Sequence, residues 1–292
     1  MHQAQIAAFL NQKGGVGKTT SVVNIGAGLT LLGKRVLIVD LDPQGHLTTF
    51  LGIEPSRFGA TVYDVLRGKA NPRESLVRQE LGARLTVDGH NTIVSMTVLP
   101  SNVDLARAES VLALQPNREF LLQEALAKIG GEFDYILIDC PPSLGLLSAN
   151  ALVAAHRVFI PVQAEFLALE SLENLLGMIE SIMDEQNPDL EIGGLIATRF
   201  DGRKVINRTV VENLKQRFGV LLLETKIREN IVLAESPGVG KDIFTYRPRS
   251  HGAQDYLNLC LEILGQGTKS EELFTVERGG AITRHPEARV AS

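Results

Sequence analysis

The sequence predicts an α/β protein with a doubly wound, mainly parallel sheet and helices on both of its faces. Apolar runs of strand length alternate with helical stretches through most of the 292 residues, which is the pattern of a parallel sheet with crossover helices. A glycine-rich segment, residues 11–20, stands between the first apolar run and the first helical stretch. Two later apolar runs end in aspartate, and ligands of such sheets bind at the carboxyl ends of the strands.

Each element follows from its local pattern. Strands are expected where short apolar runs occur, at residues 5–10, 35–40, 94–99, 135–139, 157–162, 192–198 and 221–225. Helices are expected at residues 18–32, 103–114, 118–129, 169–183, 207–218 and 254–264. Residues 57–94 contain several Gly, Pro and Asn and are expected to hold short helices and a turn at 88–91. Right-handed crossovers would join these elements into a single domain, residues 1–265.

Composition limits the class of protein. Residues 266–292 are rich in Gly, Ser and charges, so we expect a disordered tail. No apolar run reaches the about 18 residues of a membrane span, and the first strand begins too early for a signal peptide. We therefore expect a soluble, cytoplasmic protein. Cys140 and Cys260 form no C-x-x-C motif, which argues against a disulfide framework, a zinc site or a self-contained iron–sulfur ligand set.

The glycine-rich segment reads Asn-Gln-Lys-Gly-Gly-Val-Gly-Lys-Thr-Thr. The ordinary phosphate-loop pattern G-x-x-x-x-G-K-[ST] needs a glycine where this chain has Gln12. Its physical core is nevertheless present, because glycines here can turn backbone N–H groups toward phosphate oxygens. Lys18 would supply positive charge to the β and γ phosphates, and Thr19 a hydroxyl to Mg²⁺. The expected nucleotide-binding residues are Lys13, Gly14, Gly15, Val16, Gly17, Lys18, Thr19 and Thr20.

Lys13 is an additional lysine at the start of this loop. It cannot easily curl back onto the phosphates that its own loop wraps, so one use is to reach a phosphate held by another subunit. The alternative is an ordinary solvated surface lysine. The residues alone leave these two interpretations open.

Three aspartates stand at expected strand ends. Asp139 is followed by Cys-Pro-Pro, which cannot continue as a strand, and its carboxylate could hold Mg²⁺ through water. The alternative is a cap for the next helix. Asp40 and Asp42 lie in the sequence D-L-D-P-Q-G, where a carboxylate could orient the water that attacks ATP. Turn chemistry alone would also explain this loop.

The charge distribution is asymmetric. The net charge is −5, which by itself predicts no affinity for nucleic acid. Residues 199–251, however, carry eleven Lys or Arg against six Asp or Glu, which makes this segment +5 and the remainder −10. A phosphate-backbone contact surface requires such a segment, although a mixed solvated face would give a similar count.

These motifs together resemble one family. The sequence K-G-G-V-G-K-T-T resembles the deviant Walker A loop of the ParA/MinD group of P-loop ATPases, and D-L-D-P-Q resembles its switch I motif. The segments 99–105, 134–147 and 161–172 resemble small ParA/Soj-type partition ATPases, and the resemblance spans roughly residues 5–264.

The resemblance implies a function and partners. It implies ATP and Mg²⁺ as cofactors, hydrolysis that is slow without a partner, and a homodimer that sandwiches two ATP molecules. Lys13 matches the signature lysine that contacts the partner's nucleotide, and Asp42 matches the aspartate tied to hydrolysis. Catalysis would thus involve Lys13, Lys18 and Asp42, and Mg²⁺ would be held, partly through water, by Thr19, Asp42 and Asp139. The switch loops would contain Asp40, Pro43, Gln44, Pro141 and Pro142.

The resemblance also implies that the dimer binds DNA without sequence preference, associates with the nucleoid, and is stimulated by a ParB-like or other small partner. Candidate DNA contacts in the basic segment are Arg203, Lys204, Arg208, Arg228, Arg247 and Arg249. The adenine side of the site would include Thr198, Ile227 and Arg228. Here the chain departs from the family, because Ile-Arg-Glu-Asn stands at 227–230 where Ile-Pro-Arg-Asn is common, so the loop beside the base is expected to differ.

Two other functions share the deviant loop. A MinD-like membrane-cycling ATPase needs a terminal basic amphipathic helix, and the sequence after Gly265 lacks the apolar stripe and the net positive charge, so no membrane partner is expected. An iron–sulfur or redox ATPase would hold a cluster with cysteines at the dimer interface. Cys140 beside the expected Mg²⁺ site and Cys260 in the last helix do not suit a shared cluster.

Overall fold

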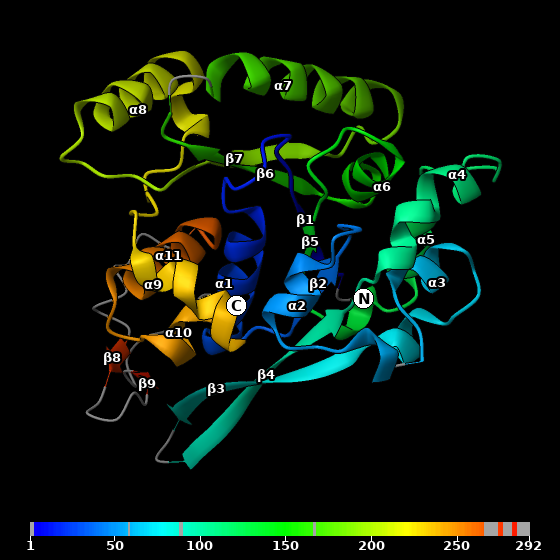
Figure 1. Ribbon diagram of the computed structural model, residues 1–292, viewed down its shortest axis with the longest axis horizontal. Coiled ribbons are helices and arrows are strands. Elements are labelled where there is room, and N and C mark those ends of the chain that lie inside the picture. The colour runs from blue at the N-terminus through cyan, green and yellow to red at the C-terminus, as the bar shows by residue number, and fades with distance from the viewer. Residues whose placement is uncertain are drawn as a thin grey trace.

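The computed structural model describes residues 3–57, 59–87, 90–165, 168–265, 274–276 and 282–284. Its strands form one sheet in the order β7-β6-β1-β5-β2-β4-β3-β9-β8 (Figure 1). Their bounds are β1 Gln5–Phe9, β2 Val36–Asp40, β3 Val77–Val87, β4 His90–Leu99, β5 Tyr135–Asp139, β6 Arg157–Gln163, β7 Glu191–Thr198, β8 Phe274–Val276 and β9 Ile282–Arg284. The pairs β3–β4 and β8–β9 are antiparallel, and the other pairs are parallel.

The helices lie between these strands. The α-helices are α1 Lys18–Leu31, α2 His46–Phe50, α3 Val62–Leu66, α4 Ala108–Leu112, α5 Leu121–Ala127, α6 Leu146–Ala154, α7 Ala168–Glu185, α8 Val205–Phe218, α9 Ile231–Glu235, α10 Ile243–Tyr246 and α11 His251–Ile263. Short 3₁₀ helices are η1 Pro55–Arg57, η2 Pro72–Ser75, η3 Val103–Arg107, η4 Gly130–Glu132, η5 Gly219–Leu221 and η6 Ser236–Val239. The predicted doubly wound α/β fold is confirmed.

The direction of the strand order reverses at β1. The chain passes from β1 to β2 on one side, leaving room for β5 between them, and later crosses from β5 over β1 to β6 on the other side. In an open α/β sheet the crevice at such a reversal, outside the carboxyl ends of the strands, is the usual ligand site. Asp40 and Asp139 end β2 and β5 as direct register partners, so two predicted site residues meet at this edge.

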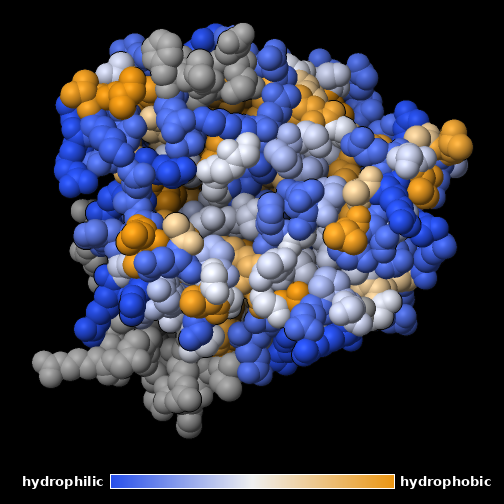
Figure 2. Space-filling model, viewed as in Figure 1, coloured by the Kyte–Doolittle hydropathy of each residue, from blue (hydrophilic) through white to orange (hydrophobic). Residues whose placement is uncertain are grey.

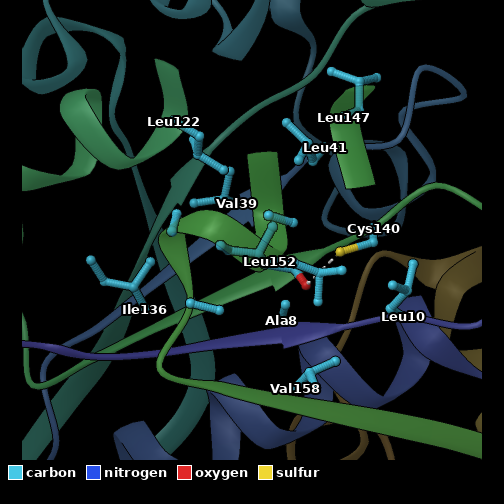
Figure 3. Packing of buried hydrophobic residues seen from close by; sticks show 14 of the residues in the cluster. Ala8, Leu10, Val39, Leu41, Leu122, Ile136, Cys140, Leu147, Leu152 and Val158 are labelled. Atoms are coloured by element: carbon cyan, nitrogen blue, oxygen red, sulfur yellow. Dashed lines mark hydrogen bonds between the residues drawn. The ribbon is translucent and has the colours of Figure 1, made fainter. Parts of the chain in front are cut away.

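Side chains on β1 alternate between two hydrophobic clusters, one on each face of the sheet. Ala8 and Leu10, the residue that follows β1, pack in the cluster that α5, α6, α7 and α8 cover, and Figure 3 shows Ala8 between Leu152 and Val158 and Leu10 near Cys140. Ala7 and Phe9 pack on the opposite face, in the cluster that α1, α10 and α11 cover. Because successive strand residues point to opposite faces, an apolar run without polar breaks forms a strand that is buried on both sides.

The antiparallel arm was not expected from the sequence. We predicted an irregular stretch at residues 57–94 and a strand that starts at Val94, whereas β3 pairs with a β4 that already begins at His90. Residues 77–81 alternate between buried or half-buried and exposed positions in the structure, but only Val77 and Leu81 among them are apolar and Gly82 interrupts the pattern, so the sequence hides the strand. The expected turn at 88–91 agrees with the pairing of Val87 with His90, although residues 88–89 lie outside the described part.

The expected strand at residues 221–225 is wrong. The segment begins with η5, and only an isolated bridge between Leu195 and Leu222 joins it to β7. The carboxylate of Glu262 on α11 accepts the backbone N–H groups of Glu224 at 2.6 Å and Thr225 at 2.9 Å. A side chain therefore takes the donors that a further strand ladder would have used.

The other expected helices form, with different bounds. The helix expected at 103–114 divides into η3 and the short α4. Helix α11 starts three residues earlier than expected, because the Ser250 side chain caps it by accepting the N–H of Ala253. In the expected tail, the structure describes only β8 and β9, and β9 pairs with β3. The rest of 266–292, where a MinD-like terminal helix would lie, is outside the described residues.

Candidate functional site: a phosphate-binding loop between acidic strand ends

The loop after β1 is held open by its own side chains and glycines. Asn11 donates to the carbonyl of Pro161 on β6 at 2.7 Å and accepts the N–H of Lys13 at 2.9 Å. Gly15 and Gly17 have φ of 75° and 89°, a region that other residues enter only with strain. No atom lies within 4 Å of where a Cβ on Gly14 or Gly15 would stand, so the loop backbone borders open space. This is the geometry of an anion cradle at a helix N-terminus.

Lys18 and Thr19 begin α1 and face the end of β5. Lys18 is buried, and burial lowers the pKa of its ammonium, while Asp139 opposes that shift. The hydroxyl of Thr19 donates to Oδ2 of Asp139 at 2.7 Å. Burial raises the pKa of Asp139 well above its usual value, and the neighbouring Asp40 adds to the rise. A cation bound beside this carboxylate would favour its charged form and so oppose that rise.

One oxygen of that carboxylate has no partner. Oδ1 of Asp139 is buried, and within the described part of the chain no donor reaches it. An unsatisfied buried oxygen costs free energy, and Mg²⁺ or a water of its shell would satisfy it. The residues present therefore fit a magnesium site made by Thr19 and Asp139.

Asp40 is a structural carboxylate rather than a free one. Its Oδ2 accepts from both the N–H and the hydroxyl of Thr48, at 2.8 and 2.6 Å, and its Oδ1 accepts the N–H of Asp42 at 3.2 Å. Burial raises the pKa of Asp40 to about 6. These bonds fix the start of the loop that carries Asp42.

Asp42 is held from two sides. Its Oδ1 accepts the N–H of Gln44 at 2.9 Å, which closes the turn through Pro43, and its carbonyl accepts from the hydroxyl of Ser101 at 2.9 Å. The N–H of Ser101 in turn donates to the hydroxyl of Thr48 at 2.9 Å. Thr48 and Ser101 are therefore supporting residues that we did not predict. The sequence signal for Ser101 was the family-like segment at 99–105, and the interpretation of the sequence offered none for Thr48.

Lys13 points to the loop after β6. Its ammonium lies 2.6 Å from Oε2 of Glu165, and Gln163 donates to the other carboxylate oxygen at 2.6 Å. The Lys13 side chain is 38% exposed and that of Glu165 is 50% exposed. Within this single chain, Lys13 therefore pairs with a surface carboxylate of its own subunit, and Glu165 is a site residue that sequence reasoning missed.

A pocket of about 560 Å³ opens beside the loop. Its lining includes Gly15, Gly17 and Thr20 of the loop and α1, together with the three residues expected near adenine, Thr198, Ile227 and Arg228. Unpredicted lining residues include Glu229, Asn230 and Tyr256. The volume suits a nucleoside, because small-molecule sites typically measure about 300–1,000 Å³. The hydroxyl of Thr198 donates to the carbonyl of Val16 at 2.8 Å, so the end of β7 is bonded to the phosphate loop.

Arg228 stands at the position where the family commonly has proline, and this chain uses its backbone N–H. Its N–H donates to Oδ2 of Asp255 at 2.9 Å, and its guanidinium contacts the same carboxylate at 2.6 to 3.0 Å. A proline has no N–H and could not make the first bond. Asp255 lies on α11 and its side chain is only 7% exposed, so Arg228 anchors the pocket wall to that helix.

The candidate DNA-contact residues are only partly brought together. Arg203 and Lys204 lie directly before α8, and Arg208 lies in its first turn. Arg203 pairs with Asp201, and Arg208 donates to the carbonyl of Gly202. Arg247 caps α10 and lies over the ring of Tyr246 at 5.1 Å, and Arg249 follows it before α11. The face in Figure 2 is largely hydrophilic, with separate hydrophobic spots over α8 and α4.

The two cysteines lie on opposite faces of the sheet. Cys140 packs in the cluster under α6 and contacts the carbonyl of Ile138, as Figure 3 shows, whereas Cys260 packs in the cluster under α1. Both are buried, and burial raises the pKa of both thiols. In the described ranges no group of three or more His, Cys, Asp or Glu is placed to hold a metal. None of the helices in those ranges has the length and apolar content of a membrane-crossing segment.

Comparison with known proteins gives a consistent family. A family model described as an AAA domain matches residues 4–192. The sporulation initiation inhibitor protein Soj of Bacillus subtilis is 43% identical over 263 residues, 90% of this chain and 99% of Soj. The chromosome partitioning protein ParA of Caulobacter vibrioides is 38% identical over 264 residues, 90% of this chain and 94% of that protein.

A solved structure agrees in fold. The structure described as cobyrinic acid a,c-diamide synthase from Mycobacterium smegmatis with bound ADP and magnesium superposes with a TM-score of 0.76 at 39% identity, covering 91% of this chain and 97% of that one. Taken with the phosphate loop and the aspartates at the ends of β2 and β5, these matches show that the chain belongs to the ParA/Soj family of partition ATPases, within the P-loop group.

Proposed function

We propose that this protein is an ATP-dependent positioning ATPase that hydrolyses Mg²⁺-ATP, dimerises around two ATP molecules and binds DNA without sequence preference in that form. A ParB-like or other small partner stimulates its hydrolysis, so that a chromosome, plasmid or other cargo is moved. The observation that carries the proposal is the orphaned Oδ1 of Asp139, buried beside Thr19 and Lys18 at the mouth of the phosphate loop. Membership of the ParA/Soj family supports the proposed dimerisation, DNA binding and stimulation by a partner.

The proposal gives a task to each residue of the site. The loop N–H groups and Lys18 bind the phosphates, and Thr19 and Asp139 hold Mg²⁺, which neutralises charge on the β and γ phosphates when bound. Asp42 orients the attacking water by accepting a hydrogen bond from it. The oxygen of that water bonds to the γ phosphorus as the bond to the ADP oxygen breaks, which leaves ADP and phosphate. Asp40, Thr48 and Ser101 position the Asp42 loop.

Lys13 acts in the dimer. Its ammonium leaves Glu165 and contacts the nucleotide of the partner subunit across the interface. The pairing with Glu165 supports this role, because an exposed ion pair is worth only about 0–1 kcal/mol and is readily exchanged for a phosphate contact.

The basic segment provides the DNA contact. Arg203, Lys204 and Arg208 lie together at the start of α8, within the segment of charge +5. Contacts to phosphates release counterions, so the affinity should fall steeply as salt increases. Such binding places the protein on the nucleoid.

DNA retention with and without ATP tests the proposal. Purified protein is applied to nonspecific duplex DNA at low salt, and dimerisation is followed by light scattering. Wild type should be retained with Mg²⁺-ATP and released as ATP is hydrolysed. Asp42→Ala should stay dimeric and DNA-bound, and Lys18→Ala should do neither. Absence of any ATP-dependent retention of the wild type would refute the proposal.

The name of the solved relative suggests a second candidate, ATP-dependent amide synthesis on a corrin-type acid. Amide synthesis that takes ammonia from glutamine needs a thiolate nucleophile. Cys140 and Cys260 are both buried with raised pKa, which does not support that role. ATP turnover in the presence of glutamine and a corrin acid, compared with turnover in the presence of DNA and a ParB-like partner, distinguishes the two.

A further inference from the structure

We propose that Glu229 couples the nucleotide pocket to the DNA-binding segment, by holding Lys204 and Arg199 until a nucleotide base enters the pocket. The inference rests on the proposed function and adds a regulatory residue to it. The partner that the released cations would bind is the phosphate backbone of DNA.

The carboxylate of Glu229 pairs with both Lys204 and Arg199. Oε2 of Glu229 lies 2.6 Å from the ammonium of Lys204, and Oε1 lies 3.7 Å from the guanidinium of Arg199. The hydrogen bond from Lys204 lowers the pKa of Glu229, so this carboxylate stays ionised at neutral pH. All three side chains are about half exposed, at 42% for Glu229, 51% for Lys204 and 55% for Arg199. Exposed pairs of this kind exchange partners at little cost.

Glu229 also lines the nucleotide pocket. The phosphates of a nucleotide belong at Gly15 and Gly17, so its base belongs among the other residues that line the pocket, which include Ile227, Glu229 and Asn230. The exocyclic amino group of adenine donates hydrogen bonds, and in the proposed coupling such a bond draws the Glu229 carboxylate into the pocket and away from Lys204 and Arg199. A bound base therefore weakens the hold on both cations.

The backbone joins the two regions as well. The N–H of Phe200 donates to the carbonyl of Ile227, and the N–H of Glu229 donates to the carbonyl of Phe200, both at 3.0 Å. Arg199, directly before Phe200, has a φ of 49°, which is uncommon for a residue with a side chain. A shift of the pocket wall at 227–229 thus moves the loop that carries Arg199 and Lys204.

Pairing with Glu229 determines how strongly Lys204 and Arg199 attract DNA. Lys204 and Arg199 belong to the +5 segment, and while Glu229 holds them, its charge opposes their attraction to a polyanion. When they are released, Lys204 and Arg199 are unpaired cations beside Arg203 and Arg208. Nucleotide binding and DNA binding then strengthen each other, because such coupling is reciprocal.

The test compares Glu229→Gln with Glu212→Gln. Both variants remove one negative charge from the same segment, but Glu212 lies on the exposed side of α8 and contacts Gln216 there. Binding to a fluorescent nonspecific duplex is measured without nucleotide at several salt concentrations. We expect Glu229→Gln to bind about threefold to tenfold tighter than Glu212→Gln, with a salt slope steeper by about 0.9 for each further phosphate that the freed cations neutralise. Adding Lys204→Gln to Glu229→Gln should reverse most of this increase in affinity.

A second arm measures the increase in DNA affinity on adding ATP. The increase should be larger for wild type than for Glu229→Gln, since the variant has already released its cations, and Lys204→Gln alone should bind DNA more weakly than wild type with ATP. If wild type binds DNA with ATP but Glu229→Gln matches Glu212→Gln in both arms, the coupling role of Glu229 is wrong and the proposed function stands. If wild type shows no ATP-dependent DNA binding, the proposed function fails and this inference fails with it.

Discussion

The ammonium of Lys13 lies 2.6 Å from Oε2 of Glu165, a residue 152 positions further along the same chain. The lysine that distinguishes this loop from an ordinary phosphate loop is thus held by its own subunit. The loop after β6 that carries Glu165 is fixed in turn, because its Ala164 carbonyl accepts from the Asn207 side chain at 2.7 Å. In the dimer that we propose, Lys13 would have to leave Glu165 in order to reach the nucleotide of the partner subunit.

Lys13→Gln should retain a folded monomer and lose ATP-dependent dimerisation. The exposed side chain contributes little to stability, so the free energy of unfolding should change by less than about 1 kcal/mol. Without the ammonium, the partner's nucleotide loses a charge-assisted contact, and ATP turnover should fall at least about tenfold. Light scattering and a phosphate-release assay measure both, with exposed Lys69→Gln as the control. Unchanged dimerisation and turnover would show that Lys13 is an ordinary surface lysine.

Glu165→Gln should have the opposite effect on assembly. Removing the carboxylate frees Lys13 in the monomer, and loss of an exposed pair worth up to about 1 kcal/mol should lower the protein concentration needed for the ATP dimer by about twofold to fivefold. Analytical ultracentrifugation with a slowly hydrolysed ATP analogue measures this shift. Glu191→Gln, which loses only a 3.7 Å pair with Arg157, serves as the matched control. A dimer that forms at the same concentration in both variants would mean that Glu165 does not restrain Lys13.

Asp40 should make the stability of the nucleotide-free protein depend on pH. The pKa of Asp40 is about 6 in the folded chain against a usual 3.8. Its contribution to the free energy of unfolding is therefore most favourable below pH 3.8 and is lost as the pH rises through 6. Asparagine does not titrate, so the Asp40→Asn variant does not show this decrease in stability. The free energy of unfolding of the variant relative to wild type should therefore increase by about 2 kcal/mol between pH 4.5 and 7.5.

Urea unfolding at the two pH values tests the role of Asp40. Asp201→Asn is the control, because the hydrogen bonds from Arg203 lower the pKa of that carboxylate to about 2, so it stays ionised over this range and the relative stability should change by only about 0.1 kcal/mol. A relative stability of Asp40→Asn that stays constant over this range would contradict the raised pKa.

Asp255→Ala should destabilise the protein and weaken nucleotide binding together. The substitution leaves the N–H and guanidinium of Arg228 without their carboxylate, and since Arg228 is partly exposed we expect a loss of about 1–3 kcal/mol. The pocket wall at 227–230 then loses its anchor to α11, so the dissociation constant for ATP should rise. Urea unfolding and fluorescent-nucleotide titration measure the two effects. Glu235→Ala, outside the pocket lining, should leave ATP affinity unchanged.

Much of the site was predictable because its parts are local in sequence. The glycines of the loop, Lys18 and Thr19 are consecutive, and Asp40 and Asp139 each end a buried apolar run. Strand ends of a parallel sheet meet at one edge, so their proximity followed from the fold class. The roles of Thr48 and Ser101 could not be predicted in this way, because Ser101 reaches the Asp42 loop from 59 residues away through single hydrogen bonds.

The sequence by itself determined the doubly wound sheet and the phosphate-loop chemistry, because apolar periodicity and glycine conformations act over a few neighbouring residues. Only the tertiary structure decided which charges pair. Glu165 holds Lys13, Asp255 holds Arg228, and Glu229 holds Lys204. It likewise decided that Glu262 takes the backbone donors at 224–225, where a strand was expected. Such contacts join segments from different elements, and their geometry exists only after the chain has packed.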